Sequence, residues 1–155
     1  MRPSSSVAYC LRALVDLALH ENTGPVTVAA VAKRQGIPPA YLEQLFHRLR
    51  RKGLVAAQRG PRGGYRLKRS PKKIPLSLIF RSLESTPENH KGSVTKLAGR
   101  RPLSQGAANF DPTPFVWQQV EEAVHSTLKA TTLDALVAQA RETTLSPSHR
   151  YTFHI

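Results

Sequence analysis

Residues 25–67 read PVTVAAVAKRQGIPPAYLEQLFHRLRRKGLVAAQRGPRGGYRL, and the rest of the chain is organised around this stretch. It contains two short helical patterns separated by GIPP, then a glycine-rich turn between two segments that can pair as strands. From Lys33 to Lys73 there are thirteen lysines and arginines but one acid, Glu43, a local net charge of +12 against +13 for the whole chain. A helix-turn-helix followed by a basic hairpin indicates a protein that binds duplex DNA.

The composition of the 155-residue chain limits its class. Hydrophobic residues make up 40%, enough for one compact domain with an appended oligomerisation element. We expect no membrane-spanning helix and no signal peptide, because no apolar run has the required length or place. The single cysteine, Cys10, can form no internal disulfide and cannot hold a metal alone. These features favour a cytoplasmic protein with an anionic partner, nucleic acid before a membrane surface.

The first helix is predicted from apolar periodicity. From Val7 to Ala18 apolar residues recur every three or four positions, which predicts a helix that the hydroxyls of Ser4–Ser6 can cap and that ends near Glu21. Cys10 lies on the apolar stripe, so we interpret it as a small buried hydrophobe rather than a reactive thiol.

Two further helices form the predicted helix-turn-helix. Thr27 is a suitable N-cap for Val28–Gln35, which Gly36 ends. The next helix, Pro39–Lys52, begins at a proline and stops at Gly53. Its predicted inward face is Tyr41, Leu42, Leu45, Phe46 and Leu49. Its predicted outward face, suited to reading the major groove, is Ala40, Glu43, Gln44, His47, Arg48 and Arg51.

The glycine-rich turn is predicted to form a DNA-binding wing. Strands are expected at Leu54–Arg59 and Tyr65–Arg69, joined by GPRGG. An ordinary hairpin turn is the alternative, but Arg59 and Arg62 favour contact with the minor groove. The glycines that would let the backbone approach a phosphate are Gly60, Gly63 and Gly64. Lys68 to Lys73 is expected to continue the basic surface.

The C-terminal half supplies a second set of expectations. Leu76–Leu83 is predicted to be a short helix that covers the base of the hairpin. After a long polar segment, a second helix is predicted from the apolar stripe Trp117, Val120, Val124 and Leu128. A last helix, Leu133–Glu142, is predicted because Thr131-x-x-Asp134 resembles a capping box. We interpret the stripe as a two-fold dimer interface, with burial in a core as the alternative. The predicted divisions are 1–84, a winged helix-turn-helix domain; 85–113, a loop; 114–143, a dimerisation helix and a C-terminal helix; and 144–155, a flexible tail.

At this level of detail the chain resembles a known family. GIPPAYLEQLFHRLRRKGLVAAQRGPRGGYRL, preceded by YCLRALVDLAL, closely resembles the bacterial winged-helix transcriptional regulators of the IscR, NsrR and CymR type, most of all the iron–sulfur cluster regulators of the IscR kind. The similarity is dense over Val7–Leu83, about half of the chain, and weaker through the Trp117 helix and TTLDALV.

The resemblance implies a mainly α fold with a small β-hairpin, a winged helix-turn-helix domain and a long dimerisation helix. It assigns the major-groove helix to Pro39–Lys52, the minor-groove arginine to Arg59 and the helix that crosses between subunits to Pro114–Lys129. Base-reading positions fall on Ala40, Glu43 and Gln44, and the wing turn on Gly60, Gly63 and Gly64. The implied partner is a partly palindromic operator bound by a homodimer.

The chain departs from the family in the segment before the dimer helix. Many relatives carry three cysteines there that bind an iron–sulfur cluster, whereas residues 85–113 contain none and offer His90 as the one histidine. We therefore expect no cofactor and no metal site, with a cluster held by Cys10, His90 and groups borrowed from elsewhere as the alternative. A cysteine-free variant of a cluster-sensing regulator would have the same pattern, with Ser93, Ala98 and Ser104 at the cysteine positions. Pro38 also stands where relatives often have a capping serine.

The leading hypothesis is a homodimeric, sequence-specific regulator of transcription bound to double-stranded DNA. A regulatory protein or small-molecule effector is expected to act on the 85–113 loop. The rival is a winged-helix module that binds protein or RNA, although the basic stretch lacks the aromatic platform expected for single-stranded RNA. An enzyme is not expected, because the six histidines show no metal-ligand spacing and no nucleophile lies in a recognisable elbow.

Overall fold

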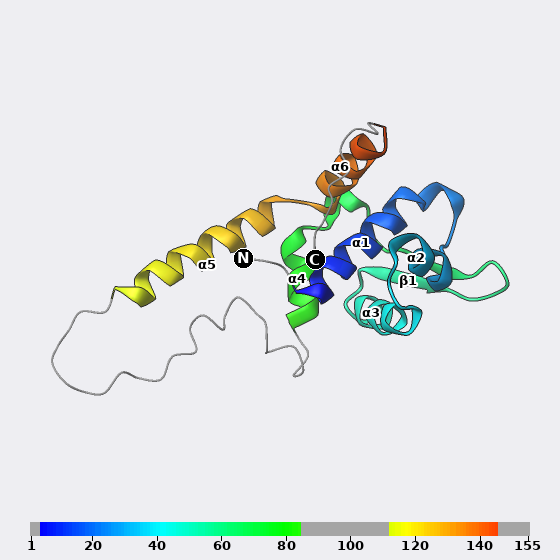
Figure 1. Ribbon diagram of the computed structural model, residues 1–155, viewed down its shortest axis with the longest axis horizontal. Coiled ribbons are helices and arrows are strands. Elements are labelled where there is room, and N and C mark those ends of the chain that lie inside the picture. The colour runs from blue at the N-terminus through cyan, green and yellow to red at the C-terminus, as the bar shows by residue number, and fades with distance from the viewer. Residues whose placement is uncertain (1–3, 85–111, 146–155) are drawn as a thin grey trace.

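A computed structural model describes residues 4–84 and 112–145, and in these ranges a helical body carries one β-hairpin, which projects from it (Figure 1). The elements in chain order are α1 (Ser5–Leu19), η1 (Glu21–Thr23), α2 (Val28–Gln35), α3 (Pro39–Arg51), β1 (Val55–Gln58), β2 (Gly64–Leu67), η2 (Pro71–Lys73), α4 (Leu76–Glu84), α5 (Thr113–Ala130) and α6 (Leu133–Leu145). The predicted mainly α fold with a small hairpin is confirmed.

The helix boundaries follow from local capping chemistry. The Ser4 hydroxyl accepts a hydrogen bond from the Val7 N–H at 3.4 Å, and the Thr27 hydroxyl accepts one from the Ala30 N–H at 3.2 Å. Gly36 ends α2 with φ +61°, a left-handed conformation that costs glycine little. The predicted α2 is therefore confirmed, while α1 ends two residues earlier than predicted and α3 one residue earlier.

Helix α1 lies at the centre of the fold. It packs against α2, α4, α6 and β2, so that elements from both halves of the chain share one core. Cys10, Leu14 and Phe46 are fully buried in that core. Their burial confirms the apolar stripe of α1 and the structural role assigned to Cys10.

The hairpin has a third partner that the sequence did not indicate. β1 and β2 are antiparallel, from Val55 opposite Leu67 at the base to Gln58 opposite Gly64 at the tip. Tyr65 also pairs with Val26: the Val26 N–H donates to the Tyr65 carbonyl at 2.9 Å, and the Tyr65 N–H donates to the Val26 carbonyl at 2.8 Å. The segment before α2 is thereby fixed to the wing.

Both strands are shorter than predicted. β1 leaves out Leu54 and Arg59, and β2 leaves out Lys68 and Arg69, although the Lys68 N–H still donates to the Leu54 carbonyl at 3.0 Å. Helix α4 also differs from its expected position, because it packs mainly on α1, α5 and α3 rather than over the base of the hairpin. Its burial of Leu76, Ile79 and Leu83 serves the helical core.

The last two helices differ in how they are packed. No residue of α5 is buried, and the helix extends away from the body of the fold (Figure 1). Helix α6 instead joins the core through Leu133 and Val137. The turn between them is held by two backbone hydrogen bonds, from the Leu76 N–H to the Thr131 carbonyl (2.9 Å) and from the Leu133 N–H to the Ile74 carbonyl (2.8 Å).

Three predictions about this end of the chain need correction. The Thr131 hydroxyl donates to the Thr127 carbonyl at 2.9 Å, so it closes α5, and Thr132 precedes α6 instead. Thr113, predicted to belong to the loop, is the first residue of α5. Residues 144 and 145, predicted to be tail, belong to α6; the rest of that tail and residues 85–111 of the loop lie outside the described ranges.

No helix within the described ranges is long and apolar enough to cross a membrane.

Candidate nucleic-acid interface

Helix α3 presents the face that was predicted to read DNA. The exposed residues of the predicted outward face are Ala40, Glu43, Gln44, His47 and Arg51. Arg48, the remaining residue of that face, is half-buried. On the predicted inward face Tyr41 is half-buried, and the other four residues are buried. No side chain caps the N-terminus of α3 at Pro38, and the first turn begins with the Leu42 N–H donating to the Pro38 carbonyl at 3.0 Å.

Aromatic contacts fix α3 to the rest of the domain. Phe46 is fully buried and stacks on Tyr65 of β2, with ring centroids 4.7 Å apart and planes at 30°. At the N-terminal end, the Tyr41 hydroxyl donates to the Ser6 hydroxyl at 2.9 Å, and the Tyr41 ring meets Tyr9 edge-on at 5.7 Å. The orientation of α3 relative to the hairpin and to α1 is therefore set by packing and not by its exposed residues.

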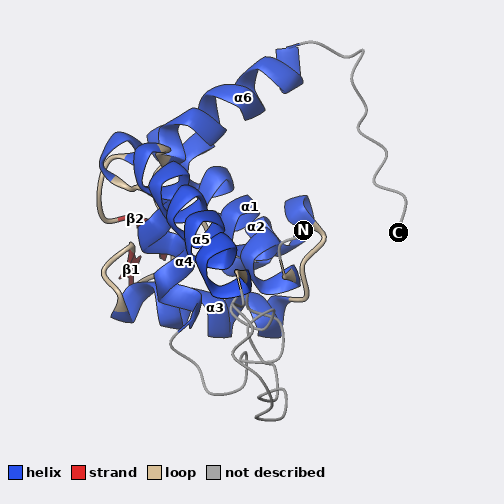
Figure 2. Cartoon of the chain, turned by 90° about the vertical axis from the view of Figure 1, so that its left-hand side faces the viewer, coloured by secondary structure: helices blue, strands red, loops and turns tan. Residues whose placement is uncertain are grey.

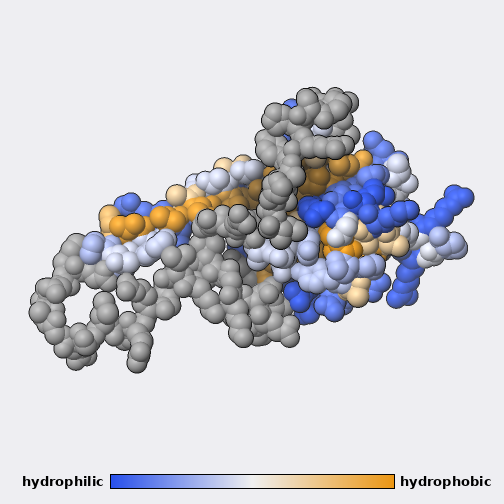
Figure 3. All heavy atoms as spheres, in the orientation of Figure 1, coloured by the Kyte–Doolittle hydropathy of each residue, from blue (hydrophilic) through white to orange (hydrophobic). Residues whose placement is uncertain are grey.

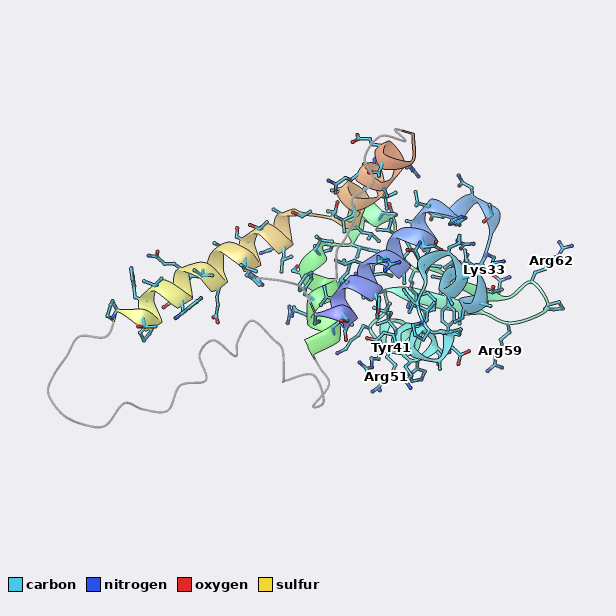
Figure 4. The ribbon with its side chains drawn as sticks, in the orientation of Figure 1. Lys33, Tyr41, Arg51, Arg59 and Arg62 are labelled. Atoms are coloured by element: carbon cyan, nitrogen blue, oxygen red, sulfur yellow. The ribbon has the colours of Figure 1, made fainter. Side chains whose placement is uncertain are left out.

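The wing tip is exposed and contains both predicted arginines. Arg59, Gly60 and Arg62 are exposed, and the turn closes with the Gly63 N–H donating to the Gly60 carbonyl at 2.9 Å. In Figure 4, Arg59 and Arg51 point to the same side of the molecule, while Arg62 extends from the tip. The wing and α3 thus bring cations from two elements to one side.

The wing glycines have different roles. A Cβ on Gly63 would lie 2.4 Å from the Gln58 carbonyl oxygen, and a Cβ on Gly64 would lie 2.5 Å from that of Val26. Both positions therefore require glycine for the packing of the hairpin itself. Gly60, with φ +115° and no atom within 4 Å of a Cβ, is the wing glycine whose surroundings are open.

A buried carboxylate holds α1 against α2, and the sequence reasoning missed it. Arg34 donates to Asp16 through Nε at 2.9 Å and through a terminal nitrogen at 2.7 Å, and Gln35 donates through Nε2 at 3.0 Å. The Asp16 side chain is 2% exposed. Arg12 in turn donates to the side chain and the carbonyl of Gln35. Asp16 is the one acidic residue of α1 and stands between Val15 and Leu17, which was the signal available in the sequence.

The ionisation of Asp16 follows from these contacts. Burial alone would raise the pKa of Asp16, but hydrogen bonds from Arg34 and Gln35, with the charges of Arg34 and His20, hold it below its ordinary value. The charge of Arg34 is therefore committed to the fold and does not belong to the free cationic surface.

Arg66 on β2 is exposed, and so are the four cations from Lys68 to Lys73 that were predicted to continue the basic surface. These four cations follow the base of the hairpin, whereas Arg59 and Arg62 lie at its tip. The η2 turn within them packs on α6, and α6 and α3 lie on opposite sides of the body in Figures 1 and 2.

The predicted dimerisation residues lie on the partly exposed face of α5. Trp117, Val120 and Val124 are half-buried, and Leu128 packs against the core at the end of the helix nearest the body. Two further apolar side chains are strongly exposed, Phe115 at 65% and Val116 at 52%. Figure 3 shows hydrophobic residues along α5 and hydrophilic residues over the hairpin.

The donor side chains of the described residues do not fit an iron–sulfur cluster. Such a cluster needs several thiolates or imidazoles, and the chain has one cysteine. Cys10 is fully buried on α1, where burial raises the pKa of its thiol to about 12. Across residues 4–84 and 112–145, no three histidine, cysteine or acidic side chains are grouped to hold a metal ion.

Comparisons with known proteins agree with this geometry. The model of the Rrf2 family, described as iron-dependent transcriptional regulators, matches residues 3–139. The HTH-type transcriptional regulator IscR of Pectobacterium carotovorum subsp. carotovorum is 37% identical over 137 residues, which cover 88% of this chain and 79% of that protein. The structure of T. potens IscR has a TM-score of 0.73 at 30% identity and covers 99% of this chain and 97% of its own. CymR, the global cysteine regulator of B. subtilis, has a TM-score of 0.68 at 28% identity and covers 90% and 98%. The predicted resemblance and the predicted winged-helix fold are both confirmed.

Proposed function

Because the chain belongs to the Rrf2 family of DNA-binding transcriptional regulators, which are not enzymes, we propose that it is a cytoplasmic homodimer that recognises one operator sequence. Helix α3 would enter the major groove and the hairpin tip would enter the minor groove. The observation that carries the proposal is the exposed face of α3, with Arg59 of the wing directed to the same side as Arg51.

The residues of this surface would divide the work of binding. Arg51, Arg59 and Arg62 would neutralise phosphates or enter the minor groove and so fix the register of the protein on DNA. Glu43 can accept a hydrogen bond from a cytosine amino group, and Gln44 can pair with adenine. Ala40 offers a methyl group to thymine, and His47 and Arg48 extend the surface along the groove.

The homodimer is supported by the unburied apolar face of α5. Trp117, Val120 and Val124 recur at helical spacing and are only half-buried, and Phe115 and Val116 beside them are strongly exposed. A second copy of α5 related by a two-fold axis would bury this face. Two reading helices would then meet two half-sites, as in other helix-turn-helix dimers.

The signal that controls binding is proposed to be something other than an iron–sulfur cluster. The family is described as iron-dependent, but this chain has one cysteine and that cysteine is buried. We assign control to a small-molecule effector or a regulatory protein acting on the segment that precedes α5. Protein purified without oxygen should show no cluster absorbance and no bound iron or sulfide. A visible spectrum with stoichiometric iron would contradict this assignment.

Selection from a random duplex library tests the central proposal. The full chain should enrich one partly palindromic sequence, and sedimentation should show two chains on each enriched duplex. A single-stranded RNA library serves as the control for the rival RNA-binding function. Enrichment of RNA alone, or recovery of duplexes without a common sequence, would refute sequence-specific DNA recognition.

A further inference from the structure

We propose that Lys68, Arg69, Lys72 and Lys73 form a second binding surface, which takes an acidic segment of a protein partner while the duplex is bound elsewhere. We call these four residues the η2 surface. The inference rests on the proposed function only for the position of the duplex, on α3 and the wing tip.

The η2 surface concentrates unpaired positive charge. Four of the six residues from 68 to 73 are lysine or arginine, and all four side chains are exposed. No carboxylate in the described part of the chain forms an ion pair with any of them. Arg34 provides the contrast, because its charge is neutralised by Asp16 at 2.7 Å. The η2 surface is therefore available to charges from another molecule.

The backbone that carries these charges is held in one conformation. The segment lies between buried Leu67 and fully buried Ile74. Inside it, the Lys73 N–H donates to the Ser70 carbonyl at 2.8 Å and the Ile74 N–H donates to the Pro71 carbonyl at 3.2 Å. A partner that binds this turn would lose little free energy to ordering the backbone.

The position of the η2 surface separates it from the proposed operator. Lys68 follows the Val55–Leu67 pair at the base of the hairpin, four register positions from the Gln58–Gly64 pair at the tip. The η2 turn packs on α6, and α6 lies on the opposite side of the body from α3, at the top of both views (Figures 1 and 2). A duplex on α3 and the wing tip would leave the η2 surface uncovered.

The surroundings favour a protein partner over a second duplex. The η2 turn has three residues and offers no helix or ribbon that could enter a groove. Asp134 stands in the first turn of α6, the helix on which η2 packs, and its charge would oppose the continuous negative charge of a phosphate backbone. A peptide with separated carboxylates can pair with lysines and avoid that repulsion.

The test uses the full chain and, as the probe, a fluorescein-labelled peptide in which glutamates alternate with glycines, so that its carboxylates are separated. Fluorescence anisotropy measures peptide binding to protein already saturated with unlabelled selected duplex, and duplex binding is measured separately. The double variant Lys72→Gln/Lys73→Gln should weaken peptide binding about fivefold, as expected for two exposed charge pairs, and change duplex affinity less than about twofold. Arg59→Gln/Arg62→Gln is the matched control and should show the reverse.

Three results would overturn the inference. The first is failure of the peptide to bind the protein–duplex complex. The second is a loss of duplex affinity in Lys72→Gln/Lys73→Gln as large as in the wing variant. The third is binding of a second, unrelated duplex that depends on Lys72 and Lys73, which would make the η2 surface a DNA site. If wild-type protein binds no duplex, the proposed function fails by itself, and peptide binding to the free protein still compares the two variants.

Discussion

Arg59→Ala should lower the salt dependence of operator binding by a predictable amount. The cationic side chains of the predicted DNA-binding set are Arg48, Arg51, Arg59 and Arg62, which give about eight phosphate contacts in a dimer and a slope of log affinity against log salt near −7. Arg59→Ala removes two of these contacts, so the slope should become about −5. Affinity should fall on every duplex sequence, because phosphate contacts carry no sequence information.

Glu43→Ala is the complementary variant. Glu43 is exposed on α3 and has no positive charge to release counterions, so its removal should leave the salt slope near −7. Discrimination between the selected operator and a duplex with one altered base pair should fall by about 1–3 kcal/mol, roughly 5- to 150-fold in affinity ratio. Affinity for a random duplex should not fall, because the variant loses a negative charge that would repel the phosphates.

The assay is a fluorescence anisotropy titration of each variant at several salt concentrations, on the selected operator and on a random duplex. Lys72→Gln serves as the matched charge control, because η2 packs on α6, away from α3, and its slope should equal that of the wild type. If Arg59→Ala and Glu43→Ala each lose as much affinity on the random duplex as on the operator, the assignment of Arg59 to phosphate contact and Glu43 to base reading is refuted. An unchanged slope for Arg59→Ala would remove the wing from the interface.

Three further variants test the scaffold. Asp16→Asn should lower the free energy of unfolding by about 2 kcal/mol at neutral pH, because it removes charge-assisted hydrogen bonds to a partly exposed arginine. The pKa of Asp16 in the folded protein is below its ordinary value near 3.9. The stabilisation that the Asp16 carboxylate contributes is therefore complete above about pH 4 and is lost as the pH falls through the folded-state pKa. Urea titrations in acid should show the unfolding free energies of the variant and the wild type converging. Gly64→Ala should cost about 1–3 kcal/mol and shift the amide resonances of Val26 and Tyr65, whereas open Gly60→Ala should leave those resonances in place. The Cys10 thiol should resist a disulfide reagent in native protein and react once in denaturant; rapid native labelling would contradict its burial.

The helices were predictable because their signals are local. Ser4 and Thr27 cap the helices that follow them, and Gly36 and Gly53 stop α2 and α3, each acting within a few residues of its position. The exposed face of α3 was predictable from helical periodicity, because its apolar residues lie on one side of the helix and are buried in a single core. The predicted reading residues therefore appear where the sequence indicated, apart from half-buried Arg48.

The parts that were missed depend on contacts between distant residues. Val26 joins the hairpin through Tyr65, and Asp16 binds Arg34, pairs separated by 39 and 18 positions. Neither pair repeats or lies next to a recognisable motif, so periodicity and turn chemistry carry no information about them. The same limit explains the misassigned packing of α4, whose apolar face was predicted correctly but whose neighbours were not.

The basic stretch shows why a charge count needs a fold before it supports a function. A net charge is a sum without direction, whereas a duplex is met by one side of a molecule. In this chain one cation is bound by a buried carboxylate, a group lies on α3 and the wing tip, and another group lies at the base of the hairpin beside α6. The proposed duplex is assigned to the second group, which is exposed together with Glu43 and Gln44. The argument for DNA therefore rests on fewer charges than the sequence suggested and on their joint exposure with the predicted base-reading side chains.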